Sequence, residues 1–197
     1  MGTRHLTMIY ANGAYRVSQY GQWDGYPDGQ GLTILTSLRG LDLSTLRERA
    51  LAVIPLTKEE MESDWEDYKK LFGDTVESSD LYFKKYPERS RDMGGDIVAF
   101  VGTQPAPVRL KINVAFAADS LFCEWAYVID CDRNTFEVFK GFNKTPLDQS
   151  ERFASLPLQP DHGEYYQVKH VASWPLQNLP SDSDFLQAFK TDDTPEN

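Results

Sequence analysis

Residues 122–140 read FCEWAYVIDCDRNTFEVFK. Large apolar side chains alternate with smaller or polar ones along 122–130 and again along 135–140, which is the pattern of strands with two different faces. The intervening residues 131–134 have the length and polarity of a hairpin loop. This stretch therefore predicts an antiparallel hairpin near the C-terminal end of the chain.

Alternation along this hairpin also predicts where its side chains point. Trp125 and Tyr127 should face the main core, and Glu124 should face the other way. Cys123 and Cys131 lie on or beside the same strand, where eight residues span roughly 26 Å, well beyond the reach of a disulfide. We therefore predict two reduced thiols.

The N-terminal end of the chain predicts a second hairpin. Residues 6–10 and 14–20 alternate imperfectly around Asn12-Gly13, a dipeptide that favours tight turns because both residues tolerate positive φ. Strict alternation over 108–116 predicts a half-buried strand, and 164–171 is a further candidate strand. The chain thus has predicted strands at both ends.

Helical periodicity fills the region between these strands. Leucines recur at helical spacing over 32–38, with Asp28 placed to cap the start and Gly40 to end the helix. Thr57 and Glu60 form the pattern of a capping box. Further helices are predicted at 43–53, 57–72, 79–86, 92–101 and 184–189.

This order of elements predicts an α+β fold. An antiparallel sheet would be built from the N-terminal hairpin and the C-terminal strands, with the helices between them packed on one face. Strands and helices do not alternate regularly, so no parallel sheet is required. A length of 197 residues suits one domain, which we place at 1–190, followed by a disordered acidic tail at 191–197.

Composition narrows the classes of function. The formal net charge of −10 opposes nucleic acid binding, and acidic residues dilute the nearest basic cluster, Lys84, Lys85, Arg89 and Arg91. No apolar run approaches the roughly 20 residues that span a bilayer, and no secretory signal pattern is present, so we expect a cytoplasmic protein without membrane contact. The histidine and cysteine spacings match no metal site, and no cofactor motif occurs. A homo-oligomer is compatible with all of this.

Residues 19–31 form the densest chemical feature of the chain. They read QYGQWDGYPDGQG and combine glycines, aromatic rings, carboxylates and amides in one turn-rich connection. Rings and carboxylates suit a small neutral or cationic polar ligand, through stacking and hydrogen bonds. The predicted ligand-binding residues are Gln22, Trp23, Asp24, Tyr26, Asp28 and Arg4.

The same residues support a purely structural interpretation. In that case Asp24 would pair with Arg4, and the rings of Trp23 and Tyr26 would fill the core beneath the first hairpin. The protein would then be a structural or protein-interaction protein without a ligand site. We predict this Arg4–Asp24 ion pair, because the first hairpin returns the chain towards its start.

Two motifs of this chain carry a resemblance. The opening Met1-Gly2-Thr3-Arg4 and the later Gln22-Trp23-Asp24-Gly25-Tyr26-Pro27-Asp28-Gly29-Gln30-Gly31 resemble a group of uncharacterised fungal, bacterial and phage proteins with an N-terminal Thr-Arg and a Trp-Asp-Gly-Tyr-Pro loop. The hairpin at 122–140 is similar to the fungal members in particular. The resemblance implies a compact natural fold and a fungal-type source, and it assigns no catalytic residue.

Two kinds of hydrolase are lesser alternatives. An N-terminal nucleophile would have to be Thr3 after an extra cleavage, because removal of Met1 exposes Gly2. A glycosidase would need two carboxylates about 5 to 9 Å apart, for which the candidates are Asp24, Asp28, Glu124 and Asp130. Whether the protein is an enzyme is left open by its sequence.

Overall fold

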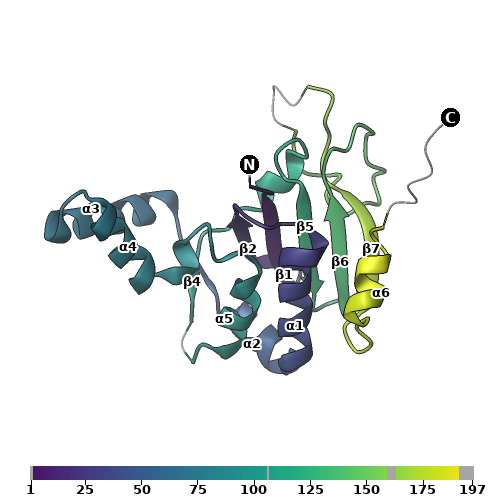
Figure 1. Cartoon of the computed structure of the whole chain (residues 1–197), viewed down its shortest axis with the longest axis horizontal. Coiled ribbons are helices and arrows are strands. Elements are labelled where there is room, and N and C mark those ends of the chain that lie inside the picture. The colour runs from purple at the N-terminus through teal and green to yellow at the C-terminus, as the bar shows by residue number, and fades with distance from the viewer. Residues whose placement is uncertain (1, 106, 159–162, 191–197) are drawn as a thin grey trace.

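The computed structural model describes residues 2–105, 107–158 and 163–190, so the predicted tail at 191–197 lies outside the described residues. The main feature is a five-stranded, mostly antiparallel sheet in the order β2-β1-β5-β6-β7 (Figure 1). Its strands are β1 (His5–Ala11), β2 (Ala14–Gly21), β5 (Trp125–Asp130), β6 (Thr135–Lys140) and β7 (Lys169–Pro175). With helices packed on the sheet, the predicted α+β class is confirmed.

Both predicted hairpins are present. β1 pairs with β2 around Asn12 and Gly13, whose φ angles of 52° and 72° are those that the turn requires. β5 pairs with β6. The two hairpins meet through β1 and β5, which run parallel because the long helical connection returns the chain to the same end of the sheet.

The main helical layer packs on the face of the sheet that carries Ile9, Tyr127 and Phe136. As predicted, Trp125 and Tyr127 share this core, whereas Ala126 and Val128 face the opposite side. The layer consists of the π-helical turn η1 (Pro27–Gly31), α1 (Leu32–Gly40), α2 (Leu43–Leu51), the 3₁₀ turn η3 (Gly94–Asp96), α5 (Ile97–Thr103) and α6 (Asp182–Gln187).

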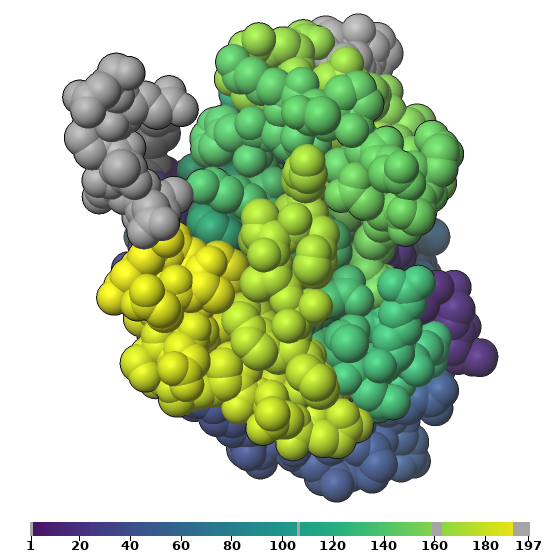
Figure 2. Space-filling view, turned by 90° about the vertical axis from the view of Figure 1, so that its right-hand side faces the viewer, coloured from purple at the N-terminus to yellow at the C-terminus, as the bar shows by residue number. Residues whose placement is uncertain are grey.

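Among the described residues, the other face of the sheet is covered by irregular segments and a 3₁₀ helix. Leu6, Met8 and Phe139 pack there against Phe153, which belongs to the irregular segment between β6 and β7. The 3₁₀ helix η4 (Val114–Ala118) completes this second core. Seen from the side of β7, the segment 141–158 lies above β7 and α6 (Figure 2).

Two helices project from this body of the molecule. They are α3 (Lys58–Phe72) and α4 (Val76–Lys85) (Figure 1). None of their residues is among the buried residues of the two apolar cores. The predicted capping box of Thr57 and Glu60 starts α3. A short parallel ribbon of β3 (Ile54–Pro55) and β4 (Arg109–Leu110) lies at the base of this helical hairpin.

The structure corrects two local predictions. Only Arg109–Leu110 of the alternating segment 108–116 is a strand, and Val114–Ala118 is a 3₁₀ helix instead. Asp28 does not cap α1, because η1 runs directly into α1 and Gly31 precedes the helix without a side-chain cap. In both cases tertiary contacts override a pattern that is locally reasonable.

Several boundaries differ by a few residues from the prediction. The strand expected at 164–171 occupies Lys169–Pro175, and the helix expected at 92–101 occupies Ile97–Thr103 after the η3 turn. The helix expected at 79–86 begins at Val76, where Thr75 and Ser78 form a capping box of their own.

Candidate functional site

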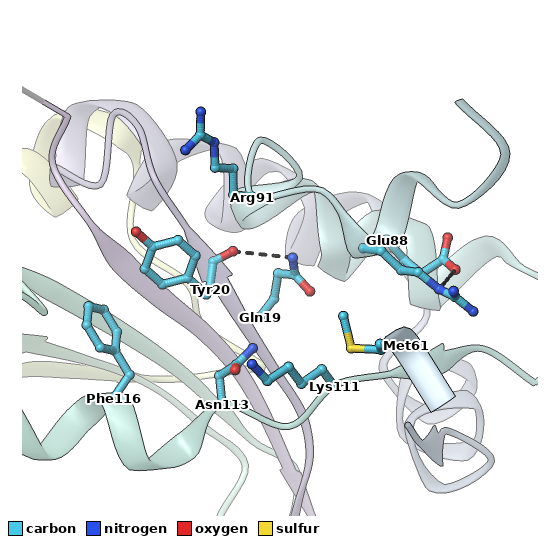
Figure 3. A pocket seen from close by; sticks show the side chains of 9 residues that line it. Gln19, Tyr20, Met61, Glu88, Arg91, Lys111, Asn113 and Phe116 are labelled. Atoms are coloured by element: carbon cyan, nitrogen blue, oxygen red, sulfur yellow. Dashed lines mark hydrogen bonds and ion pairs between the residues drawn. The ribbon is translucent and has the colours of Figure 1, made fainter. Parts of the chain in front are cut away.

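A groove of about 320 Å³ lies between the edge strand β2 and the base of the projecting helices. We call it the cationic groove. Figure 3 shows that its side chains come from four separate parts of the chain. It is lined by Gln19, Tyr20, Met61, Glu88, Arg89, Arg91, Lys111, Asn113 and Phe116.

The β3–β4 ribbon positions two of these side chains. Leu56 N donates to the carbonyl of Leu110 at 2.8 Å, so Lys111 emerges next to the start of α3. Arg109 Nη2 lies 2.6 Å from Glu60 Oε1, which ties β4 to the first turn of that helix. Met61 follows in the same turn and therefore lies across the groove from the edge of the sheet.

Strand β2 forms the opposite wall. Gln19 is buried, and its Nε2 donates to the carbonyl of Ser90 at 3.0 Å. The Asn113 backbone N–H donates to the carbonyl of Ser18 at 3.1 Å. These contacts hold the 90–91 segment and Asn113 against β2, so that the groove is framed by backbone as well as by side chains.

Arg89 is the most constrained cation of the groove. Its side chain is 5% exposed, lies 2.8 Å from Asp64 and donates to the Tyr82 hydroxyl at 2.6 Å. Burial opposes its charge, but the hydrogen bonds that it donates to Tyr82 and Asp64 outweigh burial and raise its pKa. Its Nε makes no hydrogen bond within the described residues, but it lies 3.8 Å from Glu88 Oε1, so Arg89 pairs with two carboxylates.

Two further cations have no protein carboxylate. Neither Lys111 nor Arg91 forms an ion pair with any residue of the described ranges. Glu88 is the one carboxylate that lines the groove; it pairs with Arg89 Nε at 3.8 Å, and burial raises its pKa. A local excess of positive charge thus exists in a chain whose net charge is −10.

Two of the predicted ligand-binding residues border this groove. The Gln22 backbone N–H donates to the carbonyl of Arg91 at 3.0 Å, and the Gln22 side chain accepts from the Tyr20 hydroxyl. Trp23 Nε1 donates to Asp92 at 2.8 Å, and the Arg91 guanidinium lies 5.9 Å from a Trp23 ring. Gln22 and Trp23 therefore hold the rim of the cationic groove.

Tyr26 and Asp28 lie on another surface. Together with Trp125 and Phe189 they line a hollow of about 320 Å³ beside α6, which we call the loop hollow. Asp24 has φ 52°, and its carbonyl accepts from Gln30 N at 2.9 Å. The structure thus divides the predicted site between two surfaces.

The predicted ion pair between Arg4 and Asp24 is wrong. The Arg4 guanidinium lies 4.4 Å from the centre of the Phe122 ring, and its backbone N–H donates to Glu124. Asp24 is exposed and pairs with no cation of the described residues within 4 Å. The Gly25 N–H donates to the carbonyl of Thr3 at 3.0 Å, so the backbone next to Asp24 does return to the start of the chain, as the hairpin predicted, without the ion pair.

Glycines of the loop pack against a buried histidine. His5 has no exposed surface, and a Cβ on Gly21 or Gly25 would come within 3 Å of its side chain. Burial lowers the pKa of His5 to about 4, partly offset by the Thr3 backbone. The Tyr127 hydroxyl donates to the carbonyl of Gly25 at 2.8 Å. These two glycines therefore serve close packing over His5.

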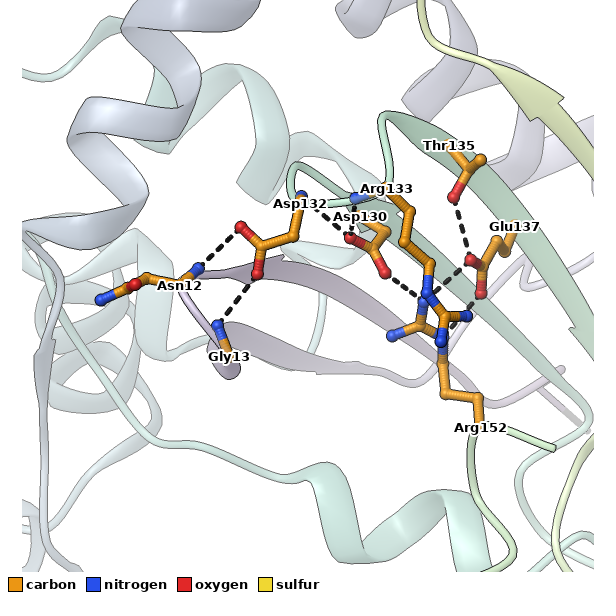
Figure 4. Close-up of polar contacts among 8 residues, drawn as sticks. All are labelled: Asn12, Gly13, Asp130, Asp132, Arg133, Thr135, Glu137 and Arg152. Atoms are coloured by element: carbon orange, nitrogen blue, oxygen red, sulfur yellow. Dashed lines mark hydrogen bonds and ion pairs between the residues drawn. The ribbon is translucent and has the colours of Figure 1, made fainter. Parts of the chain in front are cut away.

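A buried ion network lies at the other end of the sheet (Figure 4). Arg152 pairs with Asp130 and, at 2.6 Å, with Glu137, and all three side chains are less than 10% exposed. Burial opposes the charge of Arg152, but the hydrogen bonds that it donates to Glu137 and Asp130 outweigh burial and raise the Arg152 pKa. One guanidinium thus binds both carboxylates and anchors the segment around residue 152 to the sheet. Because both carboxylates are ion-paired, neither is suited to act as a general acid.

The described residues offer neither a metal site nor an activated thiol. No group of three or more His, Cys, Asp or Glu side chains there could hold a metal ion. Cys123 and Cys131 are free thiols, and burial raises the pKa of Cys131 to about 11, which disfavours a nucleophilic thiolate. Among the described residues, no helix is long and apolar enough to cross a membrane.

Comparisons with known proteins give no function for this chain, so its function has to be inferred from its own residues. No family model, no curated protein and no solved structure matches this chain.

Sequence reasoning missed most of the cationic groove. Arg89 and Arg91 belong to the basic cluster that the sequence shows, but the acidic residues beside them argue against a binding site there. Lys111 lies in a segment that was predicted as a simple strand, and Gln19 lies in the first hairpin. Only the basic cluster at residues 84–91 could have indicated the groove from the sequence. The other lining residues are brought together by long-range contacts.

Proposed function

We propose that this protein binds a small anionic molecule in the cationic groove. The observation that carries the proposal is that Arg89, Lys111 and Arg91 all line one groove, in which Glu88, paired with Arg89, is the lining carboxylate, in a chain of net charge −10. A groove of this size is within the range of small-ligand sites. The proposed class of function is still small-molecule binding. The ligand is now an anion, whereas the loop at 19–31 predicted a neutral or cationic molecule.

Each part of the groove has a distinct role in this proposal. Arg89 is held by Asp64 and Tyr82, so little side-chain freedom would be lost when an anion accepts a hydrogen bond from it. Lys111 supplies a flexible ammonium group. The amide of Asn113 adds an uncharged donor that would orient the ligand, whereas Gln19 Nε2 is already used by the carbonyls of Tyr20 and Ser90 and serves the wall of the groove.

A thermal-shift titration with phosphate, sulfate, acetate and citrate tests the proposal. A ligand at a hundredfold excess over its Kd stabilises the folded state by about 2.7 kcal/mol, which is readily measured. We expect at least one anion to raise the Tm, and Lys111→Gln to remove most of that increase.

Lys169→Gln is the matched control. It removes the same charge from β7, which is the opposite edge strand of the sheet from β2. We expect this variant to keep the full response. The absence of a shift for every anion, or an equal loss in both variants, would refute the proposal.

The loop hollow is a second candidate site, for a neutral or cationic ring-shaped ligand. Tyr26, Trp125 and Phe189 supply ring surfaces, and Asp28 has no ion-pair partner among the described residues. Lys190 lines the same hollow, which favours a neutral ligand over a cation. A Tm increase with sugars or nucleosides that Asp28→Asn abolishes and Lys111→Gln retains would establish this site.

We also propose that the protein is cytoplasmic and does not bind nucleic acid. A cytoplasmic location is supported by the two unpaired thiols, and the absence of nucleic acid binding is supported by the net charge. An interaction protein without a ligand site is the outcome if both screens fail. The exposed side chains of Leu71, Phe72 and Val76 at the tip of the projecting helices would then be the surface to test.

A further inference from the structure

We infer that the ligand of the cationic groove is an organic acid that carries an aromatic ring or a short alkyl chain. This inference rests on the proposed function and deepens it. It follows from a second cavity, of about 350 Å³, that shares three lining residues with the cationic groove: Met61, Arg89 and Lys111. We call this cavity the aromatic hollow.

The aromatic hollow lies between the two projecting helices. Trp65 comes from α3, whereas Tyr82 and Phe83 come from α4, and all three line the cavity. The Trp65 and Tyr82 rings pack edge to face with their centres 5.0 Å apart. Phe83 is 40% exposed, so its ring is available to an incoming apolar group.

Tyr82 joins the two cavities chemically. Its ring lies in the aromatic hollow, while its hydroxyl accepts from Arg89, which lines both cavities. Lys111 also lines both. A cation therefore lies at the junction, with the Asn113 amide on one side and rings on the other.

This juxtaposition selects the chemistry of the ligand. An inorganic anion would use the cations and leave the rings in contact with water. A neutral aromatic compound would use the rings and leave Lys111, which forms no ion pair within the described residues, without an anion. An acid with a ring or alkyl chain satisfies both halves, because its carboxylate can reach the junction while its apolar part covers Trp65 and Phe83.

The test compares three probes that differ in one feature at a time. Phenylacetate has the acid and the ring, acetate has the acid alone, and 2-phenylethanol has the ring alone. Titrations followed by NMR, with the Trp65 indole N–H as a reporter, measure each affinity. We expect phenylacetate to bind at least tenfold more tightly than either of the other probes.

Two variants localise the difference. Phe83→Ala should reduce the preference for phenylacetate over acetate to less than threefold without weakening acetate. Ser79→Leu, at another position that lines the hollow, should have the same effect by filling it. Lys111→Gln should weaken both acids. Far-UV circular dichroism confirms that each variant is folded.

The possible failures are distinguishable. Equal affinities for acetate and phenylacetate, both reduced by Lys111→Gln, would overturn the inference and leave anion binding intact. Binding of 2-phenylethanol as tight as that of phenylacetate would overturn the acid requirement. No binding of acetate or phenylacetate would overturn the inference, and the absence of any response to inorganic anions as well would overturn the proposed function.

Discussion

His5 shows how a single residue couples packing to pH. Its imidazole is fully buried on β1, and burial lowers its pKa from 6.5 to about 4. The unfolded chain therefore binds a proton more readily than the folded protein does between these two values. The stabilising effect of the neutral ring is complete above pH 6.5 and declines as the pH falls towards 4.

We predict that this one residue lowers the free energy of unfolding by about 3 kcal/mol between pH 7.5 and pH 4, since each pKa unit corresponds to about 1.4 kcal/mol. Urea unfolding at the two pH values measures the total change, and His5→Gln removes the part due to His5. A folded His5→Gln variant with an unchanged pH dependence would contradict the prediction. NMR titration of the ring gives the pKa of His5 directly.

Arg152 provides the second test at this scale. Arg152→Ala would leave Asp130 and Glu137 buried without their cation, and we expect a loss of about 3 to 5 kcal/mol in the free energy of unfolding. The control is Arg133→Ala, because Arg133 is exposed in the same region and forms no ion pair with described residues. Similar losses in both variants by urea denaturation would show that the network does not stabilise the sheet.

At the scale of elements, the hairpin of β5 and β6 connects the two cores. Trp125 is 8% exposed and packs edge to face on Phe189, with ring centres 5.6 Å apart. We expect Trp125→Ala to reduce the free energy of unfolding by about 3 to 5 kcal/mol, owing to lost burial and a residual cavity. Chemical denaturation measures the loss. Phe142→Ala is the control, because Phe142 is half-exposed, and a comparable loss there would contradict the assignment of Trp125 to the core.

At the scale of the whole molecule, stability should be unevenly distributed. β1 and β5 lie inside the sheet, with an apolar core on each face. α3 and α4, in contrast, contribute none of the buried residues of either core. We predict that amides of α3 and α4 exchange with solvent well before those of β1 and β5. Hydrogen exchange with mass spectrometry measures the order. Equal protection of both regions would show that the projecting helices unfold only with the rest of the chain.

Ligand binding would change this distribution if the proposed site is correct. An acid in the cationic groove would contact α3 and the edge of β2 at once, and should therefore slow exchange in α3 more than in β5. The projecting helices are then the less stable element that a ligand orders against a rigid sheet.

The success of the sequence-based predictions depends on the range of the interactions involved. The turn at Asn12-Gly13, the capping box of Thr57 and the alternation around Trp125 are each specified by neighbours within a few residues, and each is present in the structure. The segment 108–116 has equally regular alternation but is mostly not a strand. Its backbone is held by contacts with distant residues such as Ser18, which no local pattern records.

The amino-acid sequence by itself determined the hairpins, the capped helices and the α+β class, because local backbone preferences and the period of apolar residues specify them. Tertiary structure alone decided the parallel pairing of β1 with β5, the separation of Arg4 from Asp24 and the assembly of the cationic groove. The groove joins residues as far apart as Gln19 and Lys111. Their proximity is the outcome of packing the whole chain, in which many weak long-range contacts act together.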